Sequence, residues 1–465
     1  MRGGFTDFLN HFLPVRFGIS KRNIHLNQSE LKTHKVSPKN VLTDFNQTYT
    51  ITLLNFKNIC ERLEVRQLKQ FEVSDALKRL PQQFFAKLTG KARAFVAAGH
   101  DVINLGQGNP DLPTPPHIVE ALKRAADNPE YHKYSPFRGY DFLKEAVSAF
   151  YKREYGVDLD PVKEVAVLFG GKAGLVEISQ CVLNPGDVAL VPDPGYPDYW
   201  SGIAMAGAEM AKMPLIAEHD FLPDYAFIPE ETLNRAKLLF LNYPNNPTGA
   251  SATPEFFQET VRLAEKHGIC VVHDFAYAAI GFDGVKPPSF LSIPGAKEVG
   301  IEIYTLSKTY NMAGWRVGFA VGNAQVIEAI NLIQDHFYCS LFGAVQEAAK
   351  AALLGPQTCV SELASTYERR RNAFIGRLRE NGWEVKAPSG SFFCWLPVPN
   401  SLSSEQFADS LLNEAHVVVA PGIGFGEHGE GYVRIGLLAP EERLIEAADR
   451  IAKLSLFEKR LTAKE

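Results

Sequence analysis

Residues 305–318, TLSKTYNMAGWRVG, carry the most informative pattern in this chain. Lys308 comes directly after an apolar segment of strand length, EIYTLS (302–307). Burial at a strand end disfavours the ammonium form of a lysine, so such a lysine is poised to form an imine with a carbonyl compound. Arg316, eight residues further on, offers a bidentate cation for a phosphate. A lone Ser-Lys pair would indicate only a surface lysine, whereas the whole string predicts a functional site.

Further apolar segments of strand length lie upstream and downstream, separated by amphipathic helical stretches. The other strands that we predict in this part are VAVLFG (165–170), VALVP (188–192), KLLFLNY (237–243), CVVHDF (270–275) and RVGFAVG (316–322). Each is apolar on both faces, as expected when helices cover both sides of a mostly parallel sheet. From Gln334 a long helical region through Arg371 precedes a second group of elements: SFFCWLPV (391–398), HVVVAPG (416–422), YVRIGLL (432–438) and a last helix from Pro440. The fold class is therefore α/β, with a large domain around a mostly parallel central sheet and a smaller α+β domain.

Polar residues stand where three other predicted strands end. Ligands of open α/β sheets collect at the carboxyl ends of strands, so these residues should converge. Gly171 and Lys172, in FGGKAG, turn from strand into helix and present backbone N–H groups to an anion. Asp274, in HDFAY, could pair with a protonated pyridine nitrogen and keep the ring an electron sink. Tyr277 and Asn246, the latter in NPTG, could reach a phenolic oxygen on the same ring.

Each of these residues also has a purely structural explanation. Glycine-rich turns are common for steric reasons, and Asp274 could cap the following helix. Tyr277 could lie in the core, and Asn246 could serve its own turn before Pro247. Taken singly, these explanations are at least as good as the functional ones.

Taken together, the motifs occur in the order and spacing of the class I and II pyridoxal-phosphate aminotransferases. The chain resembles this family from about Phe71 to Phe457. Further matching segments are INLGQGNPDLPTP (103–115), YSPFRG (134–139), PDPGYPDYW (192–200) and PGIGFGEHGEGYVRIGL (421–437). The resemblance implies the fold-type I architecture of pyridoxal-phosphate-dependent transferases and an obligate homodimer with active sites at the subunit interface.

The resemblance also implies a role for each matching residue. Lys308 would be the catalytic residue, binding the cofactor pyridoxal 5′-phosphate covalently and moving the proton of the substrate Cα. The other cofactor-binding residues would be Gly171, Lys172, Tyr196, Asn246, Asp274, Tyr277, Thr305, Ser307, Arg316 and, reaching into the neighbouring subunit's site, Tyr134. Arg434 would bind the substrate α-carboxylate bidentately, with Gly108 and Asn246 beside it.

The domain limits follow from the same resemblance. We expect residues 69–112 to form an arm that joins the small domain, residues 113–337 the large cofactor-binding domain, and residues 338–465 the small domain. Residues 1–68 show no sustained hydrophobic period and lie outside the resemblance. They are either a targeting leader or, as we favour, sequence upstream of a mis-set start.

The region that would contact the substrate side chain favours an uncharged group. Dicarboxylate aminotransferases bind the second carboxylate with an arginine from the partner subunit. This chain has no arginine between Arg316 and Arg369, and the corresponding stretch contains Asp335 and several aromatic residues. Arg138, in YSPFRG, is a possible substitute.

Whole segments resemble the bacterial aminotransferases of methionine salvage. These segments are LPQQFFAKL (80–88), AVLFGGKAGLVE (166–177) and APGIGFGEHGEGYVRIGLL (420–438). The resemblance implies amination of 4-methylthio-2-oxobutanoate to methionine, with glutamine or another amino acid as the donor.

Composition sets aside several other classes of protein. The net charge is −5 and the basic residues are scattered, so no nucleic-acid partner is expected. The six cysteines form no close pairs, which predicts neither a disulfide framework nor a metal site and suits a reducing cytoplasm. No apolar run approaches the roughly 20 residues that span a bilayer, so no membrane association is expected.

Three alternatives remain open. The chain could be an aminotransferase for other neutral or aromatic amino acids. It could be a C–S lyase of the same fold, which needs the same Lys308, Asp274 and Arg434. A non-catalytic pyridoxal-phosphate-binding regulatory domain would need an N-terminal helix-turn-helix, and the leader shows no plausible one.

Overall fold

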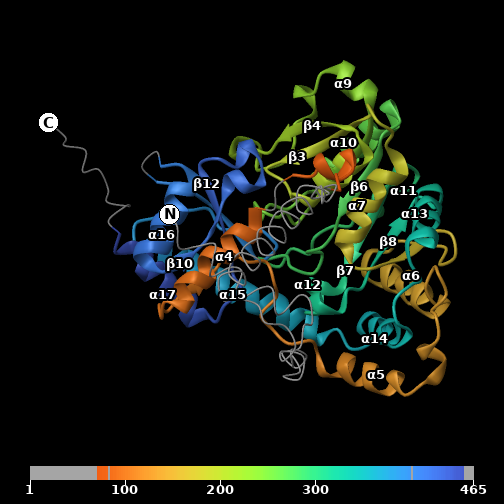
Figure 1. Ribbon diagram of the computed structural model, residues 1–465, viewed down its shortest axis with the longest axis horizontal. Coiled ribbons are helices and arrows are strands. Elements are labelled where there is room, and N and C mark those ends of the chain that lie inside the picture. The colour runs from red at the N-terminus through yellow and green to blue at the C-terminus, as the bar shows by residue number, and fades with distance from the viewer. Residues whose placement is uncertain (1–70, 82–83, 400–401, 455–465) are drawn as a thin grey trace, which may run out of the picture. The chain divides into compact units, whose positions relative to one another are not determined.

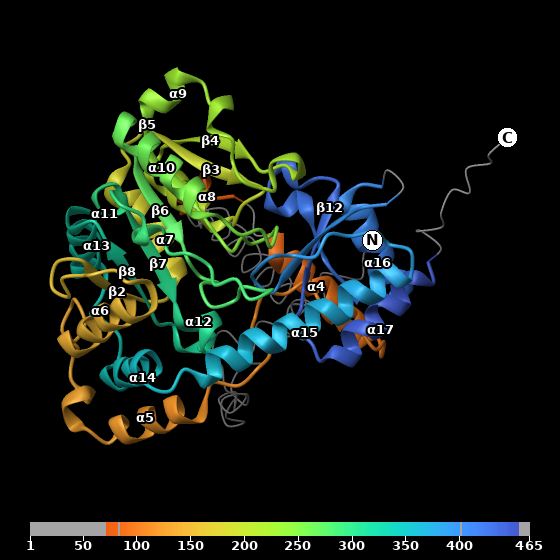
Figure 2. The same cartoon turned by 180° about the vertical axis from the view of Figure 1, so that it is seen from behind.

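The computed structural model describes residues 71–81, 84–399 and 402–454, so the predicted leader, residues 1–68, lies outside the described residues. The following description concerns the compact unit Val73–Glu465. Its central sheet has seven strands in the order β2-β8-β7-β6-β5-β3-β4. Figures 1 and 2 show this sheet from opposite sides. These strands are β2 (Val165–Leu168), β3 (Val188–Asp193), β4 (Glu209–Pro214), β5 (Ala236–Leu241), β6 (Cys270–Asp274), β7 (Gly300–Thr305) and β8 (Gly318–Gly322).

All six strands predicted for the central sheet are present, and the sheet is mostly parallel, as expected. Strand β8 is the exception, because it runs antiparallel to both of its neighbours, β2 and β7. The prediction missed β4, which pairs in parallel with β3 at the edge of the sheet. Its sequence, EMAKMP, is mostly exposed and therefore lacks the apolar run that marks the other strands.

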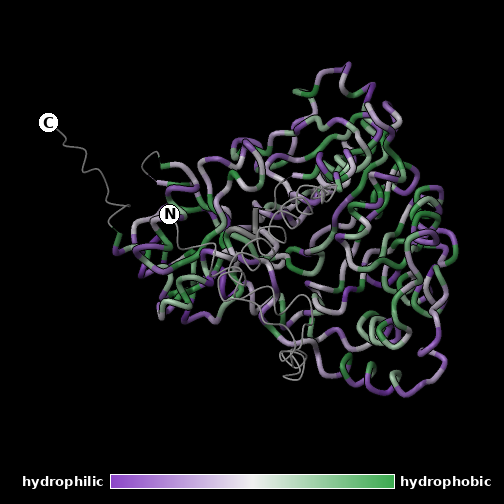
Figure 3. Tube along the Cα trace, viewed as in Figure 1, coloured by the Kyte–Doolittle hydropathy of each residue, from purple (hydrophilic) through white to green (hydrophobic). Residues whose placement is uncertain are grey.

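Helices cover both faces of the central sheet. They are α5 (Pro116–Ala126), α6 (Asp141–Tyr155), α7 (Gly171–Val182), α8 (Asp198–Ala206), α9 (Glu230–Arg235), α10 (Pro254–His267), α11 (Ala296–Val299), α12 (Leu306–Thr309), α13 (Ala324–Phe337) and α14 (Gly343–Leu354). Successive residues of a strand point to opposite faces. Val271 accordingly packs in the core shared with α6, α10 and α14, while Val272 packs in the core shared with α7, α8 and α13. This double burial explains why the strands other than β4 are mostly hydrophobic (Figure 3).

A second, smaller sheet has the order β11-β12-β9, and a separate two-stranded sheet pairs β1 with β10. These strands are β1 (Ile103–Asn104), β9 (Phe393–Pro397), β10 (Val417–Val418), β11 (Ala420–Pro421) and β12 (Tyr432–Gly436). The helices near them are α4 (Phe84–Ala97), α15 (Thr358–Glu380), α16 (Ser404–Ala415) and α17 (Glu441–Ala452), whereas α3 (Asp75–Lys78) contacts α8. Helices α15, α16 and α17 share one hydrophobic core with β1, β9, β10 and β12, and Figure 2 shows α15 running alongside α17.

We call the part that carries the seven-stranded sheet the large region and the part that carries the three-stranded sheet the small region. The domain limits at residues 112 and 337 stay predictions. Strand β1 pairs with β10 of the small region, Ile103 opposite Val417, as an N-terminal arm would. The single helical region predicted from Gln334 through Arg371 is wrong in detail. It comprises the end of α13, then α14, which stops before the helix-breaking pair Gly355 and Pro356, and then α15.

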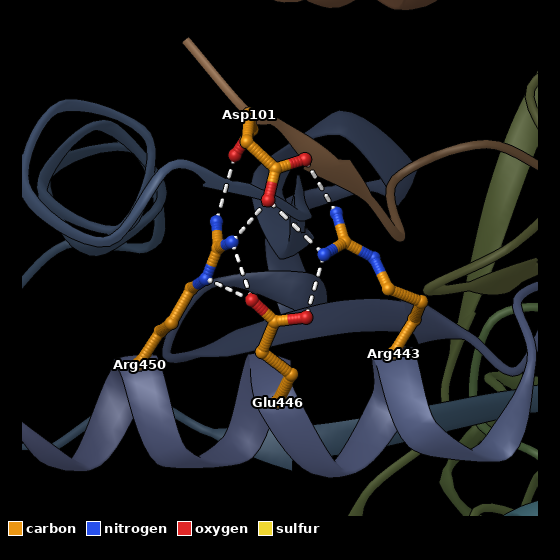
Figure 4. A network of polar contacts seen from close by, with 4 residues as sticks. All are labelled: Asp101, Arg443, Glu446 and Arg450. Atoms are coloured by element: carbon orange, nitrogen blue, oxygen red, sulfur yellow. Dashed lines mark hydrogen bonds and ion pairs between the residues drawn. The ribbon is translucent and has the colours of Figure 1, made fainter.

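The segment between α4 and β1 is fastened to α17 through Asp101 (Figure 4). Arg443 donates to the Asp101 carboxylate over 2.7 and 3.0 Å, Arg450 contacts the same carboxylate, and Glu446 pairs with both arginines. Hydrogen bonds from Arg443 and Arg450 lower the pKa of Asp101 to about 2.

Within the described residues, no helix combines the length and apolar character needed to cross a membrane.

Candidate active site

The carboxyl ends of β5, β6 and β7 face a cavity of about 450 Å³ to which the small region also contributes. The cavity brings together twelve of the thirteen residues predicted for the site. They are Gly108, Gly171, Lys172, Tyr196, Asn246, Asp274, Tyr277, Thr305, Ser307, Lys308, Arg316 and Arg434. The thirteenth, Tyr134, does not line this cavity and is 92% exposed.

Lys308 lies in the short helix α12, one turn beyond the end of β7 rather than immediately at the strand end. Its Nζ donates a hydrogen bond of 2.7 Å to the carbonyl oxygen of Gly108, which belongs to the loop after β1. Burial, followed by the positive charge of Arg434, lowers the pKa of Lys308 to about 8. A substantial fraction of this amine is therefore neutral near physiological pH, as a nucleophilic lysine requires.

Asp274 ends β6, is buried and lines the same cavity. Burial raises its pKa to about 6, although a hydrogen bond of 2.8 Å from the Tyr199 hydroxyl acts in the other direction. A buried carboxylate of this kind gains stability from a cationic partner. The cavity side of Asp274 therefore fits a protonated ring nitrogen.

Sequence reasoning missed Tyr199 and Asn242. Tyr199, in α8, follows Tyr196 by three residues, and the two rings meet edge-on with their centres 5.8 Å apart. This spacing of two tyrosines was available in GYPDY. Asn242 comes directly after β5; its Nδ2 donates to the Asp274 carbonyl (2.7 Å), and its Oδ1 accepts from the Asn246 N–H (2.7 Å). Its position at the start of NYPNNPTG was the available signal.

The amino end of α7 forms an anion cradle. Its first residue is Gly171, and the preceding Gly170 has φ 79° and no capping side chain. A Cβ on Gly170 would lie 2.5 Å from Nη2 of Arg316, so the backbone and the guanidinium are closely fitted. The hydroxyls of Thr305 and Ser307, 2.9 Å apart, line the same cavity. Backbone N–H groups, hydroxyls and an arginine are the donors that a phosphate group uses.

The side chain of Lys172 has another partner. Its Nζ lies 2.9 Å from Oδ1 of Asp198, the first residue of α8. The prediction assigned a role only to backbone groups at this position, and the observed ion pair leaves that role possible.

Arg434 lies on β12 and is buried. Its Nη1 donates to Oδ1 of Asn246 (2.9 Å) and its Nη2 to the carbonyl of Gly106 (2.9 Å). The guanidinium carbon is 4.1 Å from the ring centre of Phe393 and 4.7 Å from that of Phe425. Burial lowers its pKa to about 10, which still leaves it a cation at neutral pH. This cation is therefore well held to receive a carboxylate.

Tyr196 and Tyr277 both line the cavity, and burial raises the pKa of each above its ordinary value. Both therefore remain neutral phenols at neutral pH, and each can donate a hydrogen bond.

Arg138, the possible second carboxylate-binding arginine, is occupied by acidic residues of its own chain. Its Nε and Nη2 donate to Asp335 over 3.0 and 2.9 Å, and Nη1 and Nη2 donate to Glu328 over 2.7 and 3.0 Å. A guanidinium engaged by two carboxylates has little positive charge left for a third.

A half-buried lysine, a buried carboxylate, a buried arginine and an anion cradle line one cavity, a set of groups that can bind an anionic carbonyl compound and an amino acid. Residues 100–451 match the family described as aminotransferase class I and II. The chain belongs to this family of pyridoxal-phosphate-dependent transaminases and has its fold-type I architecture. Both the expected fold and the expected enzyme class are thereby confirmed.

Individual relatives agree with this assignment. The L-glutamine–4-(methylsulfanyl)-2-oxobutanoate aminotransferase of Bacillus subtilis is 68% identical over 388 residues, which cover 83% of this chain and 98% of the relative. The LL-diaminopimelate aminotransferase of Moorella thermoacetica is 46% identical, covering 81% and 97%. The solved structure of apo-BacF from Bacillus subtilis is 52% identical, with a TM-score of 0.81 and coverage of 83% and 99%.

Proposed function

We propose that this enzyme transfers an amino group to 4-methylthio-2-oxobutanoate, giving methionine in a salvage pathway, with glutamine as a donor. The observation that carries the proposal is the similarity to a relative named for these two substrates. The two sequences are 68% identical, and the match covers 98% of the relative. The cavity supports it through its chemistry, because it combines a carboxylate-binding arginine with apolar wall residues.

The cofactor would be held along one side of the cavity by this chain's own residues. The cradle at the start of α7, with Thr305, Ser307 and Arg316, would bind the phosphate. Asp274 would pair with the ring nitrogen, Asn246 and Tyr277 would bind the phenolic oxygen, and Tyr196 would cover the ring face. Bound pyridoxal 5′-phosphate supplies an aldehyde and an electron-withdrawing ring, which make the Cα–H of an attached amino acid acidic.

Lys308 and Arg434 would then act on the substrate. Arg434 would fix the α-carboxylate with its two N–H edges and so orient the Cα–H bond. Lys308, with its lowered pKa, would take the Cα proton as a general base and deliver it as a general acid. Its hydrogen bond to the Gly108 carbonyl ties this amine to the loop that also contacts Arg434 through Gly106.

The functional unit would be a homodimer in which Tyr134 serves the partner's site. Tyr134 is 92% exposed, yet the next residue, Ser135, is buried and donates to the Leu341 carbonyl over 2.7 Å. Arg138 anchors the same segment to α13 through Asp335. An exposed tyrosine on an anchored segment would be available for contact with a second chain. Sedimentation equilibrium should give twice the monomer mass.

An uncharged substrate side chain is favoured over an acidic one. Glu328 and Asp335 form ion pairs with Arg138 and so balance its positive charge. Among the described residues that line the cavity, Lys308, Arg316 and Arg434 have the roles proposed above, and Lys172 pairs with Asp198. The thioether of 4-methylthio-2-oxobutanoate needs no cation.

Steady-state kinetics with a panel of 2-oxo acids tests the proposal. We expect 4-methylthio-2-oxobutanoate to have the highest kcat/KM with glutamine as donor. A hundredfold preference for phenylpyruvate or 2-oxoglutarate would overturn the substrate assignment. Release of pyruvate and ammonia, without formation of a new amino acid, would instead identify a C–S lyase.

A further inference from the structure

A loop of the small region, residues 422–430, reaches the large region beside the cavity. It consists of two short 3-10 helices, η7 (Gly422–Phe425) and η8 (Glu427–Gly429). Phe425 is completely buried; its ring lies 4.7 Å from the Arg434 guanidinium and meets Trp395 edge-on at 5.8 Å. The position of this loop therefore determines where the Phe425 ring packs on Arg434, the residue that would bind the substrate carboxylate.

On the side of the large region, the loop contacts Asp193, the last residue of β3. Its side chain is 2% exposed. Oδ1 accepts a hydrogen bond of 3.1 Å from the His428 backbone, and Oδ2 lies 3.3 Å from the His428 Nδ1 and 3.4 Å from the Nζ of Lys212 on β4. Partial burial acts to lower the pKa of Lys212. A hydrogen bond to Glu427 and the charge of Asp193 act in the other direction, so that the pKa of Lys212 is raised overall. The buried carboxylate thus lies at ion-pair distance from one lysine and accepts a backbone hydrogen bond from the loop.

The backbone is fitted to the same carboxylate. Gly426 has φ 129°, and a Cβ at this position would collide with the Asp193 carboxylate. Directly beside it, the Gly195 N–H donates to the Phe425 carbonyl over 2.8 Å. Gly195 immediately precedes Tyr196, so the contact joins the loop to the segment that carries a cavity residue.

The far end of the loop is anchored separately, within the small region. The Glu430 carboxylate accepts hydrogen bonds from the backbone N–H of Ser404 (2.6 Å) and from its hydroxyl (2.8 Å). The fold of the loop consequently does not depend on Asp193 alone. Asp193 contributes to the placement of the loop against the large region, together with the Gly195–Phe425 hydrogen bond and an ion pair of 3.0 Å between Lys212 and Glu427.

We propose that Asp193 is a positioning residue for substrate binding: it seats the 422–430 loop, through His428 and Lys212, so that Phe425 stays packed on Arg434. The inference rests on the proposed role of Arg434 as the α-carboxylate ligand. It assigns Asp193 no contact with substrate or cofactor. Its loss should weaken the binding of every substrate with an α-carboxylate and leave the proton-transfer machinery in place.

Kinetics and hydrogen exchange of Asp193→Asn test this role. We expect KM for methionine and for 4-methylthio-2-oxobutanoate to rise about tenfold with kcat within about twofold, the pattern of lost uniform binding. The dissociation constant of pyridoxal 5′-phosphate should not change. In the apoenzyme, hydrogen–deuterium exchange should become faster in peptides covering residues 193–200 and 420–430. The double variant Lys212→Met/His428→Gln, which alters half-exposed partners only, should reproduce both effects.

The exposed ion pair between Asp220 and Lys386 provides the matched control. It joins the large region to the segment before β9 over 2.7 Å, but both side chains are more than 70% exposed, at 75% and 77%. Asp220→Asn should leave KM and exchange unchanged. Unchanged KM in Asp193→Asn, or an equal loss of cofactor affinity, would overturn the proposal. Failure of the wild-type enzyme to transaminate would overturn the proposed function instead, and the exchange experiment would still report on the seating of the loop.

Discussion

The hydroxyl of Tyr199 donates a hydrogen bond of 2.8 Å to Oδ2 of Asp274, and both side chains are buried. Burial alone would favour the protonated carboxyl group. The hydrogen bond lowers the pKa of Asp274 against that tendency, with a net value of about 6. Tyr199 thus helps to keep Asp274 ionised at neutral pH, which is the form that can pair with a protonated ring nitrogen.

Replacement of Tyr199 by phenylalanine should therefore slow catalysis without unfolding the protein. A hydrogen bond to a charged group is worth about 1.5–3 kcal/mol, so we expect kcat to fall roughly tenfold or more. Tyr243→Phe is the matched control, because this buried tyrosine donates over 2.8 Å to the Phe221 carbonyl instead. Equal kcat values for the two variants would contradict the role given to Tyr199.

The lowered pKa of Lys308 predicts how the apoenzyme takes up its cofactor. Attack on an aldehyde needs the neutral amine, so the rate of capture should rise with pH and level off above about 8. The positive charge of Arg434 contributes to the low value. Arg434→Gln should consequently move the midpoint to higher pH. Stopped-flow absorbance after mixing apoenzyme with pyridoxal 5′-phosphate measures both, and a rate independent of pH from 6 to 9 would refute the prediction.

Gly170→Ala should weaken cofactor binding. The new methyl group would lie 2.5 Å from Arg316, at a residue with φ 79°, and would displace the guanidinium from the cradle. We expect the dissociation constant of pyridoxal 5′-phosphate to rise about tenfold, as for loss of one charged hydrogen bond. Gly268→Ala is the control, because it has φ 67° but no atom within 4 Å of the added carbon. It should cost stability without altering affinity in an equilibrium titration.

The Asp101 network predicts a pH-dependent contribution to stability. The pKa of Asp101 is about 2 in the folded chain, below the value of about 3.9 for an unfolded aspartate. Its contribution is therefore complete above pH 4 and is lost as the pH falls from about 4 towards 2. The difference in Tm between wild type and Asp101→Asn should be constant from pH 8 to pH 5 and shrink below pH 4. A difference in Tm that grows on acidification would exclude this role.

Arg138 should not control the choice of 2-oxo acid. Because Glu328 and Asp335 already engage it, Arg138→Gln should change the ratio of kcat/KM for 2-oxoglutarate and 4-methylthio-2-oxobutanoate by no more than about twofold. A selective loss of activity with 2-oxoglutarate would show that Arg138 binds a side-chain carboxylate after all.

The sequence predicted most of the sheet because its strands are buried on both faces and therefore continuously apolar. It failed for β4, where an exposed edge strand leaves no such signature. It also joined α13, α14 and α15 into one region, since local propensity alone does not place the loop at residues 338–342. Lys308, Asp274 and Gly171 were predicted from motifs at strand ends. Gly108, Tyr196 and Arg434 were predicted only from the family resemblance.

Other parts of the site depend on tertiary contacts. The 2.8 Å bond between Tyr199 and Asp274 joins residues that are 75 positions apart. The occupation of Arg138 by Glu328 and Asp335 depends likewise on how α13 packs. Neither relationship has a local pattern, so no reading of spacing could predict it.

The pairing of β1 with β10 has a consequence for biosynthesis. The carbonyls of Gly106 and Gly108 accept hydrogen bonds from Arg434 and Lys308, respectively. Both glycines follow β1, whose partner strand β10 begins at Val417. A nascent chain emerging from the ribosome can complete the seven-stranded sheet well before this partner has been translated. Cofactor capture is therefore expected to come late in synthesis, and a ribosome-stalled chain ending before Val417 should bind pyridoxal 5′-phosphate poorly even with Lys308 already exposed to it.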